Sequence, residues 1–282
     1  IIVTMTFEEN RRTFTGCDIP SMAITLNGLG VSAIGLNCSL GPKELLPIIG
    51  ELSKWTNLPL VVKPNAGLPD PITNTYDITP EEFASYVADM TNYGIRVVGG
   101  CCGTNPEYIK ATIKKLSTIH PNVEKKEIPS AVCSSSKTVV INQPRIIGER
   151  INPTGKKRFK EALKNNDLDY ILGQAIEQAQ GGAEILDVNV GLPGIDEKEM
   201  MIKTVKALQG VTNLPLQLDS TIPEVLEAAL RVYNGKAIVN SVNGEEESLK
   251  NVLPIVKKYG AAVVGLTLDK DGIPPKAEKD LK

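Results

Sequence analysis

Histidine is almost absent from this sequence, which holds one histidine, His120, among 282 residues. Histidine is the side chain that enzymes use most often as a general acid or base. A histidine-based catalytic mechanism is therefore not expected. His120 lies at the edge of a polar stretch that we interpret as a linker, and we expect it to be solvated rather than to act as a ligand or base.

The chain also lacks a large net charge and a long apolar run. Its 31 basic and 33 acidic residues give a net charge of −2, so neither nucleic acid nor an anionic membrane surface is expected as a partner. No apolar run approaches the roughly 20 residues that a membrane span requires. The first residues show neither the basic segment nor the cleavage site of a signal peptide.

Cysteine is scarce, and its arrangement is unusual. There are five cysteines, an odd number, and two of them are adjacent, which does not fit a disulfide framework. Reduced thiols in a cytosolic protein are more often metal-binding or catalytic, so we predict a cytoplasmic protein. Cys17 and Cys133 match no motif and are predicted to be bystanders.

Short apolar strands alternate with amphipathic helices, which predicts an α/β fold with right-handed βαβ units and parallel sheets. The predicted strands cover residues 1–7, 32–38, 58–63, 95–98, 145–149, 184–190, 214–219, 236–241 and 261–268. The predicted helices cover residues 42–52, 80–93, 106–116, 158–180, 197–209, 223–233 and 245–259. Thr79 with Glu82, and Thr104 with Glu107, match the capping-box pattern at two of the helix starts.

The alternation stops between residues 120 and 144, where prolines, a charge cluster and three consecutive serines replace it. We therefore predict a domain at 1–119, a linker at 120–144 and a second domain at 145–282. One (β/α)8 barrel of about 250 residues would fit the length. The linker instead favours two consecutive (β/α)8 TIM-type barrels, both present only in part. The abrupt start inside a strand suggests a fragment, which we expect to be inactive alone.

Two adjacent cysteines, Cys101 and Cys102, follow the predicted strand 95–98, and Cys38 ends the strand 32–38. The carboxyl ends of parallel strands carry the chemistry of α/β barrels, and thiolates are good zinc ligands. The glycines on both sides of the pair would let the backbone turn sharply enough for both sulfurs to bind one metal. The alternative is that these cysteines are small buried apolar residues.

Polar residues recur where the strands of the second half end. Carboxylates accept hydrogen bonds from N–H groups and amides pair both ways, so together they suit a flat heterocycle with an amino-pyrimidine edge. One such residue would be an ordinary capping group, whereas the recurrence favours a binding site. The strand-end residues concerned are Asp187, Asn189, Asp219, Ser220, Asn240, Ser241 and Asn243. The polar loop 148–155 is a weak signal by itself and could be an ordinary βα turn.

The segments GLNCS and GGCCGT resemble the zinc-binding signature of the homocysteine-binding methyltransferase domain. That domain occurs in cobalamin-dependent methionine synthases and in betaine–homocysteine methyltransferases. The resemblance implies that Cys38, Cys101 and Cys102 are three zinc ligands and that the homocysteine sulfur takes the fourth position. Zinc stabilises a thiolate at neutral pH, and the thiolate is the nucleophile.

The segments GERINPTG, LDVN, LDS and NSVNG resemble the pterin-binding domain of the same synthases and of methyltetrahydrofolate:corrinoid methyltransferases. The resemblance implies that four residues are the main pterin contacts: Glu149, Asn152, Asp219 and Asn240. Asp187 and Asn189 are further pterin contacts that it implies. It also implies a hydrogen-bond network at the pterin rather than a dedicated proton donor.

A homocysteine domain directly before a pterin domain is the order found in cobalamin-dependent methionine synthases. The implied function is methyl transfer from 5-methyltetrahydrofolate through cobalamin to zinc-activated homocysteine, giving methionine. Cobalamin would be bound by a module of the same parent protein outside this chain. Two alternatives remain. One is an enzyme that uses only the second half, such as a dihydropteroate synthase-like enzyme or a methyltetrahydrofolate:corrinoid methyltransferase. The other is a non-catalytic module that holds zinc or pterin.

Overall fold

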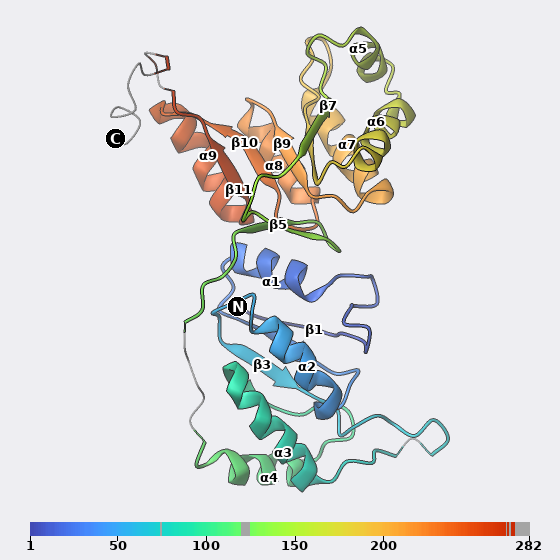
Figure 1. Ribbon diagram of the computed structural model, residues 1–282, viewed down its shortest axis with the longest axis vertical. Coiled ribbons are helices and arrows are strands. Elements are labelled where there is room, and N and C mark those ends of the chain that lie inside the picture. The colour runs from blue at the N-terminus through green and yellow to red at the C-terminus, as the bar shows by residue number, and fades with distance from the viewer. Residues whose placement is uncertain (74, 120–124, 269, 271, 274–282) are drawn as a thin grey trace. The chain divides into compact units, whose positions relative to one another are not determined.

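The computed structural model describes residues 1–73, 75–119, 125–268, 270 and 272–273, so His120 lies outside the described residues. The chain divides into two compact units, Ile1–Pro129 and Ser130–Lys282 (Figure 1). No helix in the described part of the chain is long and apolar enough to cross a membrane.

Unit 1 contains a parallel sheet in the order β1-β2-β3-β4, with a helix in each connection. The strands are β1 (Ile2–Met5), β2 (Ala33–Asn37), β3 (Leu60–Lys63) and β4 (Ile95–Val98). The helices are α1 (Ile19–Gly28), α2 (Pro42–Leu52), α3 (Pro80–Met90), the 3-10 turn η1 (Thr91–Tyr93) and α4 (Pro106–Leu116). Every strand therefore points the same way, and the loops that follow the strands gather at one rim.

The core of unit 1 forms where alternate strand residues meet the helices. Leu36 of β2 and Val62 of β3 are fully buried and belong to one apolar cluster with Leu45 and Ile49 of α2. In β2, Gly35 lies so close to the carbonyl group of Val61 that no Cβ would fit between the two strands. The close strand packing holds the ends of β2, β3 and β4 in fixed register.

Unit 2 repeats this arrangement with five parallel strands in the order β11-β10-β9-β8-β7. The strands are β7 (Ile147–Ile151), β8 (Ile185–Val188), β9 (Leu216–Asp219), β10 (Ile238–Val242) and β11 (Ala262–Gly265). The helices are α5 (Lys157–Lys164), α6 (Leu168–Gln180), α7 (Glu197–Val211), α8 (Pro223–Val232) and α9 (Glu246–Tyr259). The parallel sheets and open strand order in both units confirm the predicted class of α/β barrels present in part.

An antiparallel hairpin, β5 (Ala131–Cys133) with β6 (Thr138–Val140), packs on the sheet of unit 2. Its apolar residues Val132 and Val139 contact Ile185 and Ile238, which start β8 and β10. This hairpin lies inside the segment 120–144 that the sequence predicts to be a linker. Its contacts cover the amino-terminal end of the sheet, opposite the rim where the polar strand ends lie.

Three local predictions differ from the structure. The helix expected at 158–180 is two helices, because Asn166 takes a positive φ of 53° and Asp167 caps the start of α6. Helix α1 had no counterpart in the prediction. The start of α4 is capped by Asn105, which accepts from the N–H of Glu107, so the Thr104–Glu107 capping box is wrong. The predicted capping box of Thr79 and Glu82 is confirmed.

Candidate functional site

Cys38 follows β2 in a tight, uncommon turn. Both Cys38 and Ser39 have positive φ angles, 61° and 60°, which is rare for residues other than glycine. The turn is held by the N–H of Cys38, which donates to the carbonyl oxygen of Lys63 at 3.0 Å. Such backbone conformations cost about 1–3 kcal/mol each and cluster at functional sites. The turn therefore supports the selection of Cys38 as a site residue.

The loop after β4 carries the other two cysteines and is tied to the loop after β3. The N–H of Cys101 donates to the carbonyl oxygen of Pro64 at 2.7 Å, and the N–H of Cys102 donates to Oδ1 of Asn65 at 3.1 Å. In return, Ala66 donates its N–H to the carbonyl oxygen of Cys102 at 2.9 Å. These hydrogen bonds fix the backbone of Cys101 and Cys102 against the loop that follows the central strand β3.

The three sulfur atoms lie within 4.8 Å of one another, and the Sγ atoms of Cys38 and Cys102 are 3.7 Å apart. Sulfur ligands at about 2.3 Å from a tetrahedral zinc ion are separated by roughly 3.8 Å. The spacing and the donor type thus fit a zinc ion with one position left for a further ligand. Cys38 and Cys101 are half-buried and Cys102 is exposed, so a small molecule could reach that position.

The electrostatics of the three thiols also favour a cation. The backbone N–H of Ser39 lowers the pKa of the Cys38 thiol. Burial, together with the neighbouring Cys38 thiol, raises the pKa of Cys101 to about 11. Three thiolates at this spacing would repel one another, and a positive ion between them would offset that repulsion.

Tyr76 is a site residue that the sequence reasoning missed. Gly103 has a positive φ of 78°, and the ring of Tyr76 fills the space that a Cβ at Gly103 would need. Burial and the adjacent Cys102 sulfur raise the pKa of Tyr76. The tyrosine therefore covers the loop beside the cysteines. This role could not be predicted from the sequence, because Tyr76 lies far from the GGCCGT motif along the chain.

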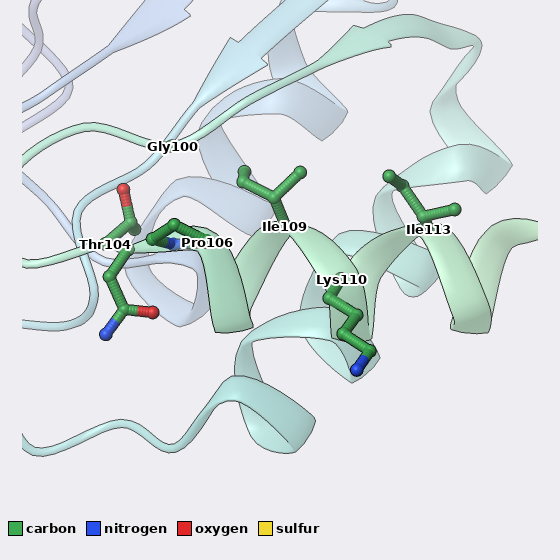
Figure 2. A pocket seen from close by; sticks show the side chains of 7 residues that line it. Gly100, Thr104, Pro106, Ile109, Lys110 and Ile113 are labelled. Carbon is green, nitrogen blue, oxygen red and sulfur yellow. The ribbon is translucent and has the colours of Figure 1, made fainter.

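A hollow of about 660 Å³ lies next to the cysteine loop, along α4 (Figure 2). Ile109 and Ile113 project to the same side of the helix, and Gly100 and Pro106 lie at its amino-terminal end. This surface is mostly apolar, and none of the three cysteines lines it. The hollow is therefore separate from the cysteine cluster at the strand ends.

In unit 2, the six predicted polar residues are distributed along one face and rim of the sheet. Asp187 is paired in register with Gln217, and Asp219 is paired with Asn240. Paired residues on neighbouring parallel strands project to the same face. The Leu186–Leu216 and Val188–Leu218 pairs face the helices instead, since all four belong to the apolar core.

Two hydrogen-bonded pairs lie at the rim of this sheet. Asn152, which is buried, donates through Nδ2 to Oε1 of Glu149 at 2.6 Å. Lys156 donates through Nζ to Oε2 of the same carboxylate at 3.3 Å. On the next strands, Asn189 donates through Nδ2 to Oδ2 of Asp219 at 2.9 Å. Sequence reasoning named four of these five residues; Lys156 was not among them.

Asp187 is the most deeply placed of the predicted residues, with 2% of its surface exposed. Its Oδ1 accepts from Nε2 of Gln217 at 2.6 Å. Burial raises the pKa of Asp187 to about 6, although the hydrogen bond from Gln217 acts in the opposite direction. A carboxyl group poised in this way can bind a ligand N–H group when ionised.

A hollow of about 730 Å³ opens beside these residues at the carboxyl ends of β8 and β9. Asn189 and Asp219 line it, together with Thr154, Glu197 and Ser220. It is mostly formed by the loop after β8, residues 189–196, and by the start of α8. The hollow has the dimensions of a small-molecule site, and two of the six predicted polar residues, Asn189 and Asp219, line it.

Two known families match the chain, one within each structural unit. Residues 1–116 match the family described as homocysteine S-methyltransferase. Residues 148–280 match the family described as pterin binding enzyme.

Two curated relatives are similar along the whole chain. Methionine synthase of Mycobacterium leprae is 34% identical over 298 residues, and that of Mycobacterium tuberculosis is 33% identical over 293 residues. Each alignment covers 100% of this chain and 25% of the relative. The chain thus spans about a quarter of the length of the curated relatives that it matches.

Among solved structures, two dihydropteroate synthases are similar to part of the chain. The enzyme of Yersinia pestis with a pterine-sulfa conjugate has a TM-score of 0.37 at 19% identity and covers 49% of this chain and 50% of that chain. The enzyme of Xanthomonas albilineans with 7,8-dihydropteroate has a TM-score of 0.33 at 22% identity and covers 48% and 47%.

Proposed function

We propose that this chain serves methionine synthesis, because residues 1–116 match the homocysteine S-methyltransferase family and residues 148–280 match the pterin binding enzymes. The proposed reaction transfers a methyl group from 5-methyltetrahydrofolate through cobalamin to homocysteine. One observation carries the proposal: three cysteine sulfurs lie within 4.8 Å of one another in the segment that matches the homocysteine family.

In unit 1, the proposed role of Cys38, Cys101 and Cys102 is to hold a zinc ion and leave one position for the homocysteine sulfur. Zinc bound there would keep the homocysteine thiol deprotonated at neutral pH. The hydrogen bonds from the loop after β3 hold Cys101 and Cys102 in place, which keeps the bound thiolate oriented. Tyr76 covers one side of this loop at Gly103.

In unit 2, the proposed role of the polar residues is to bind the pterin of 5-methyltetrahydrofolate. Asp187 and Asp219 would accept from N–H groups of the ring, and Asn189 and Asn240 would pair with its remaining donors and acceptors. Glu149 and Asn152, already bonded to each other, would close the network on the side of β7. The proposed network binds and orients the pterin without assigning one residue as its proton donor.

Cobalamin would be bound by another module of the same parent protein, and the 282 residues would act as part of that longer chain. The proposed domain boundaries are 1–119 and 145–282, with the linker between them. We also propose a cytoplasmic location, since none of the five cysteines, which all lie within the described residues, forms a disulfide, as is usual in a reducing compartment.

The test separates the two half-reactions in the longest form of the protein that can be produced. Free methylcobalamin with homocysteine tests unit 1, and cob(I)alamin with 5-methyltetrahydrofolate tests unit 2. Cys102→Ala should abolish the first half-reaction and leave the second intact, whereas Asp219→Ala should do the reverse. Loss of neither half-reaction in these variants, or the absence of both from the unsubstituted protein, would overturn the proposal. Binding of zinc and pterin without either methyl transfer would instead identify a binding module.

A further inference from the structure

The face of the unit 2 sheet that carries the predicted pterin residues changes character along its strands. At the amino-terminal end, Ile185 and Ile238 are apolar and contact the β5–β6 hairpin. Gln217 on β9 lies in register with Ile238 of β10 on one side and with Asp187 of β8 on the other. Gln217 thus sits where the apolar floor meets the polar site, at a position whose side chain could equally be apolar.

Gln217 is buried, with 7% of its surface exposed, and so is the carboxylate that it contacts. Its Nε2 donates to Oδ1 of Asp187 at 2.6 Å. A buried amide is unfavourable unless its polar atoms are hydrogen-bonded, so this bond explains why a glutamine is tolerated in the interior of a strand. The bond fixes one oxygen of Asp187, and the amide of Asn240 also interacts with this carboxylate.

We propose that Gln217 is a positioning residue for the pterin site, which orients Asp187 and keeps it ionised. This inference rests on the proposed function of unit 2 and extends it to a residue that does not itself have to touch the pterin. The amide of Gln217 acts as a fixed hydrogen-bond donor that the carboxylate would otherwise lack on that side. Without it, the carboxyl group would turn away or keep its proton.

The charges around Asp187 make such a donor necessary. Asp219 on β9 and Glu149 on β7 both act to raise the pKa of Asp187, because like charges disfavour a second carboxylate. The amide of Asn240 on β10 acts with Gln217 to lower it. These groups come from the strands on both sides of β8, and the two amides are the groups among them that favour the ionised form.

The experiment measures binding of 5-methyltetrahydrofolate to the full chain between pH 5 and pH 8.5. In the unsubstituted protein, affinity should fall as pH drops through about 6, where Asp187 gains a proton. Gln217→Met keeps the volume but removes the donor, so the midpoint should rise by about one pH unit. Affinity at pH 7 should fall about twofold, because about half of the Asp187 carboxyl groups would then be protonated.

Gln217→Glu provides a second variant of similar shape. Two carboxyl groups at this separation share a proton, so the midpoint should move higher than in Gln217→Met. The pH midpoint of binding should therefore increase from the unsubstituted protein to Gln217→Met and then to Gln217→Glu. A loss of packing alone would not produce this order. If Gln217→Met fails to fold, Gln217→Glu retains the comparison, since it keeps a polar side chain.

Gln209→Met is the matched control. Gln209 on α7 also uses its amide to donate to backbone oxygens, those of Val205 and Val232, but it lies among helix and loop contacts. Its loss should lower stability without moving the midpoint of binding. The inference is overturned if both Gln217 variants keep the midpoint of the unsubstituted protein while binding persists. If the unsubstituted protein fails to bind the folate at every pH, the proposed pterin function falls and the positioning role falls with it.

Discussion

The sulfur atoms of Cys38 and Cys102 lie 3.7 Å apart although 64 positions separate them in the sequence. Their strands, β2 and β4, are not neighbours, because β3 lies between them in the sheet. The loops after β2 and β4 approach each other across the carboxyl end of β3. Each of them is hydrogen-bonded to the residues that follow β3. The approach of the sulfurs therefore depends on three consecutive βα units folding in register.

Gly103→Ala should destabilise unit 1 more than an ordinary glycine replacement at a left-handed position. The new Cβ would meet the ring of Tyr76, in addition to adopting an unfavourable φ of 78°. We expect a loss of about 2–4 kcal/mol in urea unfolding.

Gly30→Ala is the control for this prediction. Gly30 has a similar φ of 70°, but no atom lies within 4 Å of its virtual Cβ. It should lose about 1 kcal/mol from the backbone conformation alone. Equal losses for the two variants would show that Tyr76 does not pack against the cysteine loop.

Asp187→Asn should stabilise unit 2 at neutral pH and flatten its pH dependence. The carboxyl pKa is raised from 3.8 to about 6 in the folded protein, so folding favours the protonated form. The stability linked to this group is therefore full below pH 4 and is lost as pH rises through about 6. The shift corresponds to roughly 2–3 kcal/mol.

The measurement is the difference between the unfolding free energies of Asp187→Asn and the unsubstituted protein from pH 4 to pH 8. Glu184 and Glu227 have lowered pKa values and give the opposite slope, but they are present in both proteins and cancel. A difference that stays constant with pH would show that Asp187 is not poised by burial. The same substitution should weaken folate binding, because an amide cannot replace a charged acceptor.

Tyr233→Phe should loosen the β5–β6 hairpin from unit 2. The buried hydroxyl donates to the carbonyl oxygen of Cys133 at 2.9 Å and accepts from the N–H of Leu216 at 3.2 Å. Its removal leaves two buried backbone groups without this partner, which costs about 1–3 kcal/mol. Hydrogen exchange at residues 131–140 should become faster, and unchanged exchange there would contradict the proposed attachment.

Much of the fold follows from local sequence signals. The apolar strands and the helices between them are readable because each βα unit carries its own periodicity, as at Leu60–Lys63 and Pro223–Val232. The break between α5 and α6 depends on Asn166 in a left-handed conformation, a signal too short to interrupt a helical pattern. The β5–β6 hairpin was concealed because its strands have three residues each and are stabilised by contacts with distant strands.

Some residues of the candidate sites can likewise be predicted from the sequence, and others cannot. Cysteines and polar residues at strand ends can be selected from sequence, because parallel strands bring their carboxyl ends together. Tyr76 and Gln217 could not be selected, since their roles arise from a ring over a distant glycine and from register between two strands. The distances among the cysteine sulfurs likewise require the folded sheet.

Zinc content tests the central claim most directly. The unsubstituted protein, Cys101→Ala and Cys17→Ala are purified in parallel, and bound zinc is measured by mass spectrometry after dialysis. Cys17 lies outside the cluster of three sulfurs and serves as the control for the loss of a thiol. We expect one zinc ion per chain in the unsubstituted protein and in Cys17→Ala, and a large loss in Cys101→Ala. Equal zinc in all three proteins, or zinc in none, would contradict the assignment of Cys38, Cys101 and Cys102 as a zinc site.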